Sequence, residues 1–289
     1  MKVKRLAIAA ALVPVVFVVV AWIAGTLLVA PFRRDVGSLP PDLKGEVVEF
    51  QSESGSQIHG WFLPGREGHG VIVIMHGVRA CRLDMLDRAR FLSQGGYAVL
   101  LFDFQAHGES SGQHITFGYL ESRDAQAAVR FARARLPGEK IGVIGVSMGG
   151  AAMLLAEPPL TVDGVVLEQV YPTLHQAIGD RISMRLGRWS RVLTPLLSWQ
   201  LRPRLGLSEE MLRPTDHAAK ILCPKFFIGG SEDRHTTPVE VRKMFESAAD
   251  PKELWIVPGA QHVDLSRFAR TEYKNRVLDF FARCLAPSE

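Results

Sequence analysis

The sequence predicts an α/β fold with a doubly wound, mostly parallel sheet, and three observations predict it. Short, nearly continuous apolar runs recur along the chain, as expected of strands buried on both faces. Helix-length segments with apolar residues at three- and four-residue spacing lie between these runs. The composition, 47% hydrophobic and 22% charged, is that of an ordinary globular protein, which excludes disordered and collagen-like chains.

The first 35 residues are predicted to form a single-pass transmembrane anchor with its flanks. Residues 6–32 carry no charge, and a helix of that length reaches about 40 Å, more than the roughly 30 Å of a hydrocarbon core. Three basic residues precede this span and two follow it beside Asp35, which predicts a non-cytoplasmic catalytic domain. The alternative is a cleaved signal peptide, but the run exceeds the roughly 7–15 residues of a signal core.

The net charge of +4 comes from this N-terminal segment. Five of the 34 basic residues, but only one of the 30 acidic residues, lie within residues 1–35. The remaining chain, residues 36–289, is therefore balanced in charge. A nucleic-acid-binding domain needs a basic surface to neutralise phosphates, so no nucleic-acid partner is predicted.

Residues 36–289 are predicted to form one domain that begins with a β-hairpin. Residues 46–51 and 58–64 alternate apolar and polar side chains around a Ser/Gly turn. Strand–helix alternation follows, which predicts a parallel sheet with helices on both faces. Further strands are predicted over 71–75, 98–102, 141–146, 165–167, 226–228 and 254–257, and helices over 82–94, 117–135, 239–249 and 268–285.

The strongest motif is Gly145-x-Ser147-x-Gly149, which lies between the predicted strand 141–146 and a helix rich in small and apolar residues. A sharp strand-to-helix turn of this kind holds a serine in a strained conformation with its hydroxyl exposed. The flanking glycines let the strand and the helix approach closely. The motif therefore predicts Ser147 as a catalytic nucleophile.

A serine nucleophile needs a base and a carboxylate that orients the base. With this type of turn the expected chain order is serine, acid, histidine. Asp233 follows the strand 226–228, and His262 follows the strand 254–257. Both positions lie at strand carboxyl ends, where Ser147 also lies, so we predict Asp233 as the acid and His262 as the base. The competing candidates are His175, His217 and His235 for the base, and Glu232 and Asp264 for the acid, although Asp264 is better placed to cap the following helix.

Acyl transfer also requires donors for the developing oxyanion. We predict the backbone N–H of Met148, directly after the nucleophile, and the backbone N–H of Val78, in the loop after the strand 71–75. The side chain of His76 in the same loop is expected to bond to the backbone rather than to act in catalysis.

These motifs resemble the α/β-hydrolase superfamily over about residues 36–289, and within it the membrane-anchored branch near the serine-aminopeptidase-like and bem46-like hydrolases. The resemblance implies an eight-stranded sheet with its second strand antiparallel, and Ser147, Asp233 and His262 as the catalytic triad. The family commonly has Arg-Gly where this chain has Gln105-Ala106. The residues that carry the resemblance are His76-Gly77, Asp103 to Ser110, Thr116 to Val129, Gly145 to Gly150, Gly230 to Asp233 and Gly259 to His262.

Residues 171–215 do not have the pattern of a simple crossover helix. In this family such an insert acts as a cap over the acyl pocket, and we call it the cap insert. It is rich in Leu and Trp and carries arginines at near-helical spacing, which is typical of an interfacial helix. The arginines are expected either to form a solvated face or to contact anionic lipid or an acidic substrate group. They are Arg181, Arg185, Arg188 and Arg191.

The sequence thus predicts a membrane-anchored serine hydrolase that cleaves a carboxylic ester or thioester of a small-molecule or lipid substrate. An amide or peptide hydrolase with the same triad, and a non-catalytic membrane-tethered binding module, are the alternatives. No nucleotide, flavin or metal motif is present, so no cofactor is implied. Cys81, Cys223 and Cys284 lie far apart and form no metal-ligand pattern, and they are expected to be buried thiols.

Overall fold

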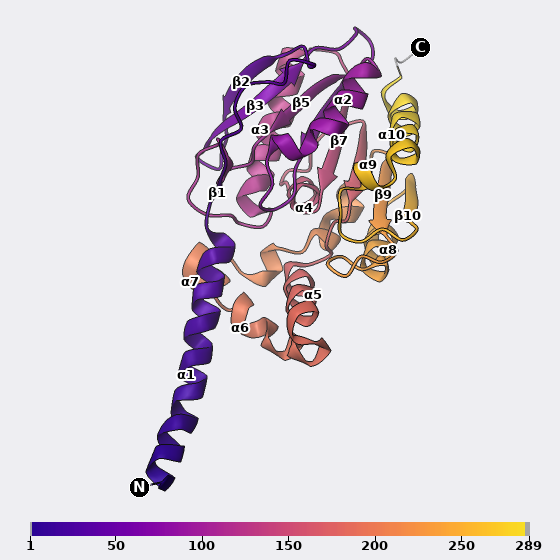
Figure 1. Ribbon diagram of the computed structural model, residues 1–289. Helices are drawn as coiled ribbons and strands as arrows, with labels where there is room; N and C mark the ends of the chain where they lie inside the picture. The colour runs from indigo at the N-terminus through magenta and orange to yellow at the C-terminus, as the bar shows by residue number, and fades with distance from the viewer. Residues whose placement is uncertain (1, 287–289) are drawn as a thin grey trace.

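The centre of the fold is an eight-stranded, mostly parallel sheet (Figure 1). The computed structural model describes residues 2–286, and side chains are described from residue 15 onward except at Arg188. The strand order is β10-β9-β8-β7-β4-β5-β3-β2, in which β3 runs antiparallel to both of its neighbours. The predicted mostly parallel sheet and the antiparallel second strand are confirmed.

The strands lie where the apolar runs predict them. The initial hairpin pairs β2 with β3 so that Val48 faces Gly60 and Phe50 faces Ile58. The five central parallel strands have continuous buried runs because helices cover both of their faces. The bounds are β2 Glu46–Gln51, β3 Gln57–Leu63, β4 Val71–Met75, β5 Ala98–Phe102, β7 Ile141–Val146, β8 Gly164–Glu168, β9 Lys225–Gly230 and β10 Lys252–Val257.

Helices cover the two faces of the sheet and enclose two apolar cores. One core packs α3, α4 and α8 against one face, and the other packs α2, α9 and α10 against the opposite face. The predicted helix over 82–94 begins with a 3₁₀ turn, and the predicted helix over 268–285 is preceded by a separate short helix. The bounds are η1 Arg82–Met85, α2 Leu86–Gln94, α3 Tyr119–Arg135, α4 Met148–Leu154, α8 Pro238–Ser247, α9 Leu265–Phe268 and α10 Arg270–Leu285.

The cap insert is a series of short helices between β8 and β9, below the sheet in Figure 1. The four arginines at near-helical spacing do not share one helix, because α5 ends at Leu186 and Gly187 follows with φ +85°. Arg181 and Arg185 therefore lie on α5, whereas Arg188 and Arg191 belong to a 3₁₀ segment. The bounds are α5 Leu174–Leu186, η2 Arg188–Leu193, α6 Thr194–Ser198, α7 Leu201–Leu205, η3 Glu209–Met211 and η4 Pro214–Lys220.

The N-terminal helix α1 (Lys2–Val29) extends away from the body (Figure 1). Of the helices that the structure describes, none combines the length and the apolar character needed to cross a bilayer. The predicted transmembrane span over residues 6–32 is thus not found, and the side chains of its first nine residues lie outside the described part. Its last residue, Phe32, belongs to β1 (Phe32–Arg33), which pairs in parallel with β6 (His107–Gly108).

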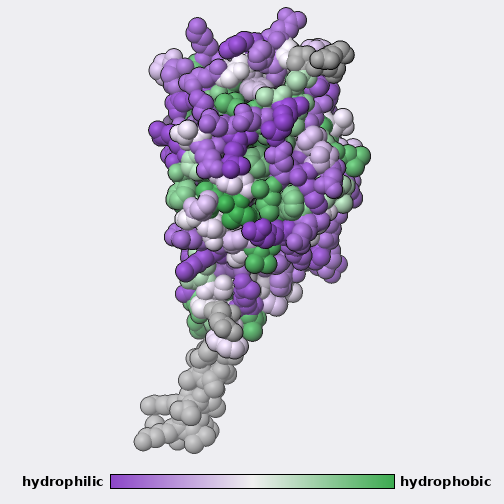
Figure 2. Space-filling view, turned by 90° about the vertical axis from the view of Figure 1, so that its right-hand side faces the viewer, coloured by the Kyte–Doolittle hydropathy of each residue, from purple (hydrophilic) through white to green (hydrophobic). Residues whose placement is uncertain are grey.

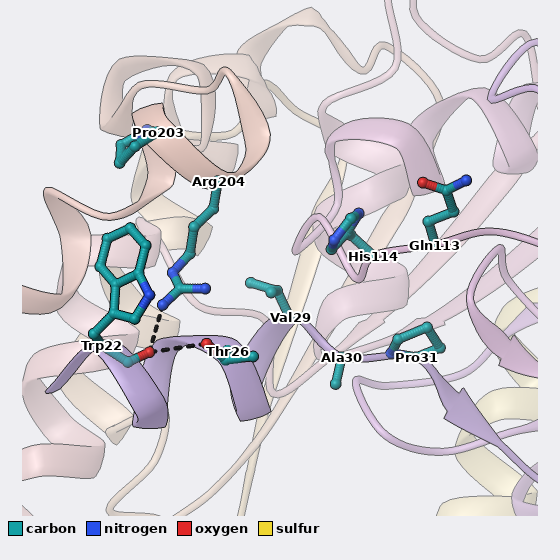
Figure 3. Close-up of a pocket in the computed structure, with 9 residues that line it drawn as sticks. All are labelled: Trp22, Thr26, Val29, Ala30, Pro31, Gln113, His114, Pro203 and Arg204. Carbon is teal, nitrogen blue, oxygen red and sulfur yellow. Dashed lines mark hydrogen bonds between the residues drawn. The ribbon is translucent and has the colours of Figure 1, made fainter. Parts of the chain in front are cut away.

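The last turns of α1 pack against the cap insert. Ala21 and Val29 are buried, and the Gln200 side chain donates to the carbonyl of Ala21 at 3.0 Å. The Arg204 guanidinium lies 3.9 Å from the centre of the Trp22 ring and bonds to the Trp22 carbonyl, as Figure 3 shows. These contacts fix the direction in which α1 leaves the domain.

Candidate active site

Ser147 occupies the sharp turn between β7 and α4, as the motif predicts. Its φ of +50° and ψ of −111° place it in a region that a residue with a Cβ rarely adopts. The turn is possible because of the glycines around it: a Cβ on Gly145 would lie 2.6 Å from the Cα of Gly150, and one on Gly149 would lie 2.4 Å from the Met75 carbonyl oxygen. The hydroxyl of Ser147 is thus held at the end of the central strand.

Asp233 and His262 meet at the carboxyl ends of β9 and β10. The Nδ1 atom of His262 lies 2.8 Å from Oδ2 of Asp233, and the Asp233 side chain is buried. Burial by itself raises the pKa of Asp233, but the contact with His262 and the backbone N–H groups of His235 and Thr236 outweigh it and lower the pKa below its usual value. The carboxylate is therefore ionised and accepts a hydrogen bond from the Nδ1–H group, which leaves Nε2 of His262 as the basic nitrogen.

Ser147 and His262 line one cavity of about 440 Å³. The Ser147 hydroxyl forms no hydrogen bond with the side chains and backbone that the structure describes. The structure therefore brings the predicted acid and base into direct contact and places the predicted nucleophile on the same cavity. Hydrogen bonds between nucleophile and base are often long in an unliganded site and tighten when substrate binds.

Gln169 is a residue of this site that the sequence analysis missed. It follows β8 with a φ of +50°, and its side-chain amide donates to Asp233 Oδ2 and to the Gln261 carbonyl, both at 3.0 Å. It thus bonds to the carboxylate oxygen that His262 uses and to the loop that carries His262. The buried side chain of Gln169 thus links the predicted acid to the loop of the predicted base.

We expect Gln169→Ala to lower kcat by about tenfold. The variant removes one hydrogen bond to a charged group, and about 1.4 kcal/mol of lost transition-state stabilisation corresponds to a factor of ten. The measurement is steady-state kinetics on a chromogenic ester. Gln261→Ala is the matched control, because this exposed glutamine contributes only its carbonyl to the network, and its kcat should stay within about twofold of wild type. Equal losses in the two variants would contradict the role of Gln169.

Of the two predicted oxyanion donors, Val78 lines the same cavity, and Met148 directly follows the Ser147 that lines it. Met148 is the first residue of α4, so that its N–H has no partner within the helix. Gly77, which precedes Val78, lies close to the nucleophile: a Cβ there would be 3.5 Å from Cβ of Ser147. The Val78 loop and the N-terminus of α4 thus both lie next to Ser147.

His76 supports this loop through its ring. Its Nε2 accepts from the Phe104 N–H at 3.0 Å, and its Nδ1 lies 2.7 Å from the Gly77 carbonyl oxygen. Burial, together with the neighbouring His107, lowers the pKa of His76 well below its usual value, so the ring is neutral. The expectation that His76 bonds to the backbone is confirmed.

The competing candidates lie elsewhere or have other partners. His175 pairs with Glu209, and His217 pairs with Glu157, both near the surface. Glu232 is exposed. Asp264 caps α9 by accepting from the Ser266 N–H at 3.0 Å, as expected.

His235 is the competing histidine that lines the cavity. Its ring stacks on His262 with centroids 4.8 Å apart. Burial and the neighbouring His262 lower its pKa, and its contact with Asp233 is made by its backbone N–H and not by its ring. His262 is therefore the histidine that the acid orients.

Gln105 and Ala106 are the positions at which this chain departs from the Arg-Gly pattern of the family. Gln105 donates from its side chain to Glu121 at 2.9 Å, and its N–H donates to Asp124 at 2.9 Å. Ala106 has a φ of +57°, a conformation in which glycine is the more usual residue. Burial raises the pKa of Asp124 to about 7, against hydrogen bonds from Ser54 and Gln105 that lower it.

This raised pKa predicts a pH-dependent stability. Because the pKa of Asp124 is higher in the folded chain than its ordinary 3.8, its contribution to stability is complete below about pH 4 and is lost as the pH rises to about 7. Asp124→Asn removes the titration, and an amide can still accept from Gln105 and donate to Ser54. We expect the stability of Asp124→Asn relative to wild type to increase between pH 4 and 7 and then to level off, measured by urea unfolding. If the free energies of unfolding of the two proteins differ by a constant amount across this range, the raised pKa of Asp124 is contradicted.

No group of three or more His, Cys, Asp or Glu side chains arranged to hold a metal ion occurs among the described residues. The three cysteines are free thiols, with Cys81 buried and the other two half-buried.

Comparisons with known proteins agree with this architecture. The YqkD protein of Bacillus subtilis is 25% identical over 235 residues, which cover 79% of this chain and 76% of YqkD. The alpha/beta hydrolase domain-containing protein WAV2 of Arabidopsis thaliana is 26% identical over 240 residues, covering 76% of this chain and 72% of WAV2. Among solved structures, the esterase Pf2001 of Pyrococcus furiosus superposes with a TM-score of 0.74 and 26% identity, covering 89% of this chain and 98% of the esterase.

The family model described as serine aminopeptidase, S33, matches residues 66–210, half of the chain. The matched segment includes the β4 loop, the Ser147 turn and most of the cap insert. The fold, the turn geometry and these similarities together support a hydrolase. The chain belongs to the serine aminopeptidase (S33) family of the α/β-hydrolase superfamily.

Proposed function

We propose that this protein is a serine hydrolase that cleaves a carboxylic ester or thioester through an acyl-enzyme intermediate. The observation that carries the proposal is the contact between His262 and the ionised Asp233 at the cavity that also contains the strained Ser147. The similarity to an esterase structure over most of the chain supports ester chemistry.

In the proposed mechanism Ser147 attacks the acyl carbonyl while Nε2 of His262 takes its proton. Asp233 holds Nδ1 and stabilises the imidazolium that forms. The backbone N–H groups of Val78 and Met148 bind the tetrahedral oxyanion. His262 then returns the proton to the leaving group, and a water activated in the same way hydrolyses the acyl-enzyme.

Amide hydrolysis at the same triad is the second candidate, because the matched family is described by an aminopeptidase activity. An aminopeptidase binds a substrate with a cationic amino terminus. Of the three arginines in the cavity lining, Arg88 and Arg267 are paired with carboxylates, whereas Arg181 has no ion pair among the described residues, and its charge disfavours a cation beside it. The lining therefore favours esters over amino-terminal amides.

The experiment is a substrate panel of p-nitrophenyl esters, acyl-thioesters and aminoacyl p-nitroanilides. We expect hydrolysis of esters or thioesters by wild type and none by Ser147→Ala. A preference for the anilides would establish the aminopeptidase alternative. Absence of turnover on the whole panel, or full activity in Ser147→Ala, would contradict the proposed function and favour a non-catalytic binding module.

We also propose that the protein associates with a membrane through α1, with its catalytic domain on the non-cytoplasmic side. Figure 2 shows apolar surface where α1 leaves the body. The adjacent cap insert has exposed apolar side chains, and its residues 182–207 contain five arginines and no acidic residue, a charge that suits an anionic lipid surface. The exposed apolar side chains of α1 include Val15 to Val20, Ile23 and Leu27, and those of the cap insert include Leu186 and Val192.

Membrane fractionation of the full chain, followed by protease treatment of intact cells or spheroplasts, tests this location. We expect the protein in the membrane fraction and cleavage of its catalytic domain from the outside. Recovery in the soluble fraction after expression of the full chain would contradict membrane association, and protection from protease would contradict the orientation.

A further inference from the structure

Arg181 brings a guanidinium into the catalytic cavity. It lies on α5 of the cap insert, is mostly buried, and lines the same cavity as Ser147 and His262. Its one hydrogen bond among the described residues goes from Nη1 to the Ala177 carbonyl of its own helix, at 2.9 Å. The adjacent acid, Asp180, pairs with Arg191 instead.

The other arginines of the cavity differ from Arg181 in having carboxylate partners. Arg88 pairs with Glu168 at 2.6 Å and with Asp264 at 2.9 Å. Arg267 pairs with Asp87 at 2.6 Å. None of the ion pairs of the described residues includes Arg181, so it is the cavity arginine whose charge the protein leaves unpaired.

An unpaired guanidinium in a largely buried place is costly. It carries five N–H donors and stays charged, and burial without a counterion is unfavourable. Burial accordingly lowers the pKa of Arg181, although Tyr171 and Asp233 partly offset this. The donors that Ala177 does not use are available to a ligand in the cavity, and the planar fork matches a carboxylate or phosphate.

We propose that Arg181 binds an anionic oxygen group of the substrate, a carboxylate or a phosphate, which lies beyond the scissile carbonyl. This inference rests on the proposed function and specifies its substrate class. The anion lies either on the acyl chain, as in a half-ester of a dicarboxylic acid, or on the leaving group, as in an acylated glycerol phosphate. Both present the same chemistry to the guanidinium.

Two matched substrate pairs distinguish these sources. The acyl arm compares mono-p-nitrophenyl adipate with p-nitrophenyl hexanoate, which has the same chain length without the carboxylate. The leaving-group arm compares 1-butyrylglycerol 3-phosphate with 1-butyrylglycerol. In whichever arm carries the anion on the correct side of the scissile bond, we expect the kcat/KM of wild type to be about 10- to 100-fold higher for the anionic substrate than for its neutral partner. This is the range expected of a charge-assisted hydrogen-bonded pair.

The variants test whether this selectivity comes from Arg181. Arg181→Gln should reduce the anionic-to-neutral ratio of kcat/KM to about one, and Arg181→Lys, which keeps the charge but not the fork, should give an intermediate ratio. Arg185→Gln is the matched control, because this exposed arginine lies one turn along the same helix and does not line the cavity, and its ratio should equal that of wild type. Circular dichroism confirms that each variant is folded.

Equal turnover of both members in both arms by wild type, or a ratio that Arg181→Gln leaves unchanged, would overturn the inference. Failure of the proposed function gives a different result, because neither neutral nor anionic esters would then react. In that case the Tm of wild type with and without adipate or glycerol 3-phosphate decides: a rise that Arg181→Gln abolishes supports the anion site, and no rise with either anion overturns it.

Discussion

Asp233→Asn is expected to lower kcat by about 10⁴-fold on any substrate that wild type hydrolyses. Oδ1 of Asp233 accepts from the N–H groups of His235 and Thr236 at 2.8 and 3.0 Å. These donors hold the oxygen of an asparagine amide in the Oδ1 position, so its NH₂ faces Nδ1 of His262. Nδ1 must then accept a hydrogen bond, the proton moves to Nε2, and the ring cannot act as a base toward Ser147.

The matched control is Glu232→Gln, one residue earlier in the same loop. Glu232 is exposed and does not line the cavity, so its replacement should leave kcat/KM within about twofold of wild type. The two variants decide between Asp233 and Glu232 as the acid. A large loss in Glu232→Gln with retained activity in Asp233→Asn would reverse the assignment.

Arg88→Met is expected to lower the free energy of unfolding by about 3–5 kcal/mol, because it leaves a buried carboxylate without its counterion. Arg88 on α2 and Glu168 at the end of β8 are 1% and 0% exposed, and their side chains are joined at 2.6 and 3.1 Å. The Tyr273 hydroxyl also donates to Glu168. Urea unfolding followed by circular dichroism measures the loss.

Two further variants separate the buried charge from a general effect on α2. Arg90, two residues further along α2, is partly exposed and pairs with Asp42. Arg90→Met should therefore lower the free energy of unfolding by only about 0–1 kcal/mol. Adding Glu168→Gln to Arg88→Met should recover part of the stability, since the unpaired charge is then removed. If Arg88→Met lowers the free energy of unfolding no more than Arg90→Met does, the stabilising role of the Arg88–Glu168 pair is contradicted.

The sequence predicted much of the sheet and the residues at its edge, for a physical reason. Strands buried on both faces are continuous apolar runs, and β2, β4, β5 and β7 have the predicted bounds. Parallel strands end at one edge of the sheet, so polar residues that follow several of them meet there. For this reason Asp233 and His262 could be paired although 28 residues separate them in the chain.

The remaining features depend on contacts that local pattern does not contain. The role of Gln169 requires β8 to lie beside β9, so that an amide after one strand reaches the acid after the next. The packing of α1 on the cap insert joins residues about 180 positions apart, such as Ala21 and Gln200. Two local signals were nevertheless present: Gly187 within the arginine-rich segment indicated a helix end, and Glu168 after an apolar strand indicated a buried charge with a partner.

Covalent labelling with a fluorophosphonate tests the central claim most directly, because the reagent reacts with an activated serine and needs no knowledge of the substrate. Peptide mapping by mass spectrometry locates the phosphonylated residue. We expect one adduct, on Ser147, in wild type, and none in Ser147→Ala or His262→Ala. An adduct on a different residue, an unlabelled wild-type protein, or labelling of Ser147 that persists undiminished in His262→Ala would contradict the proposed triad.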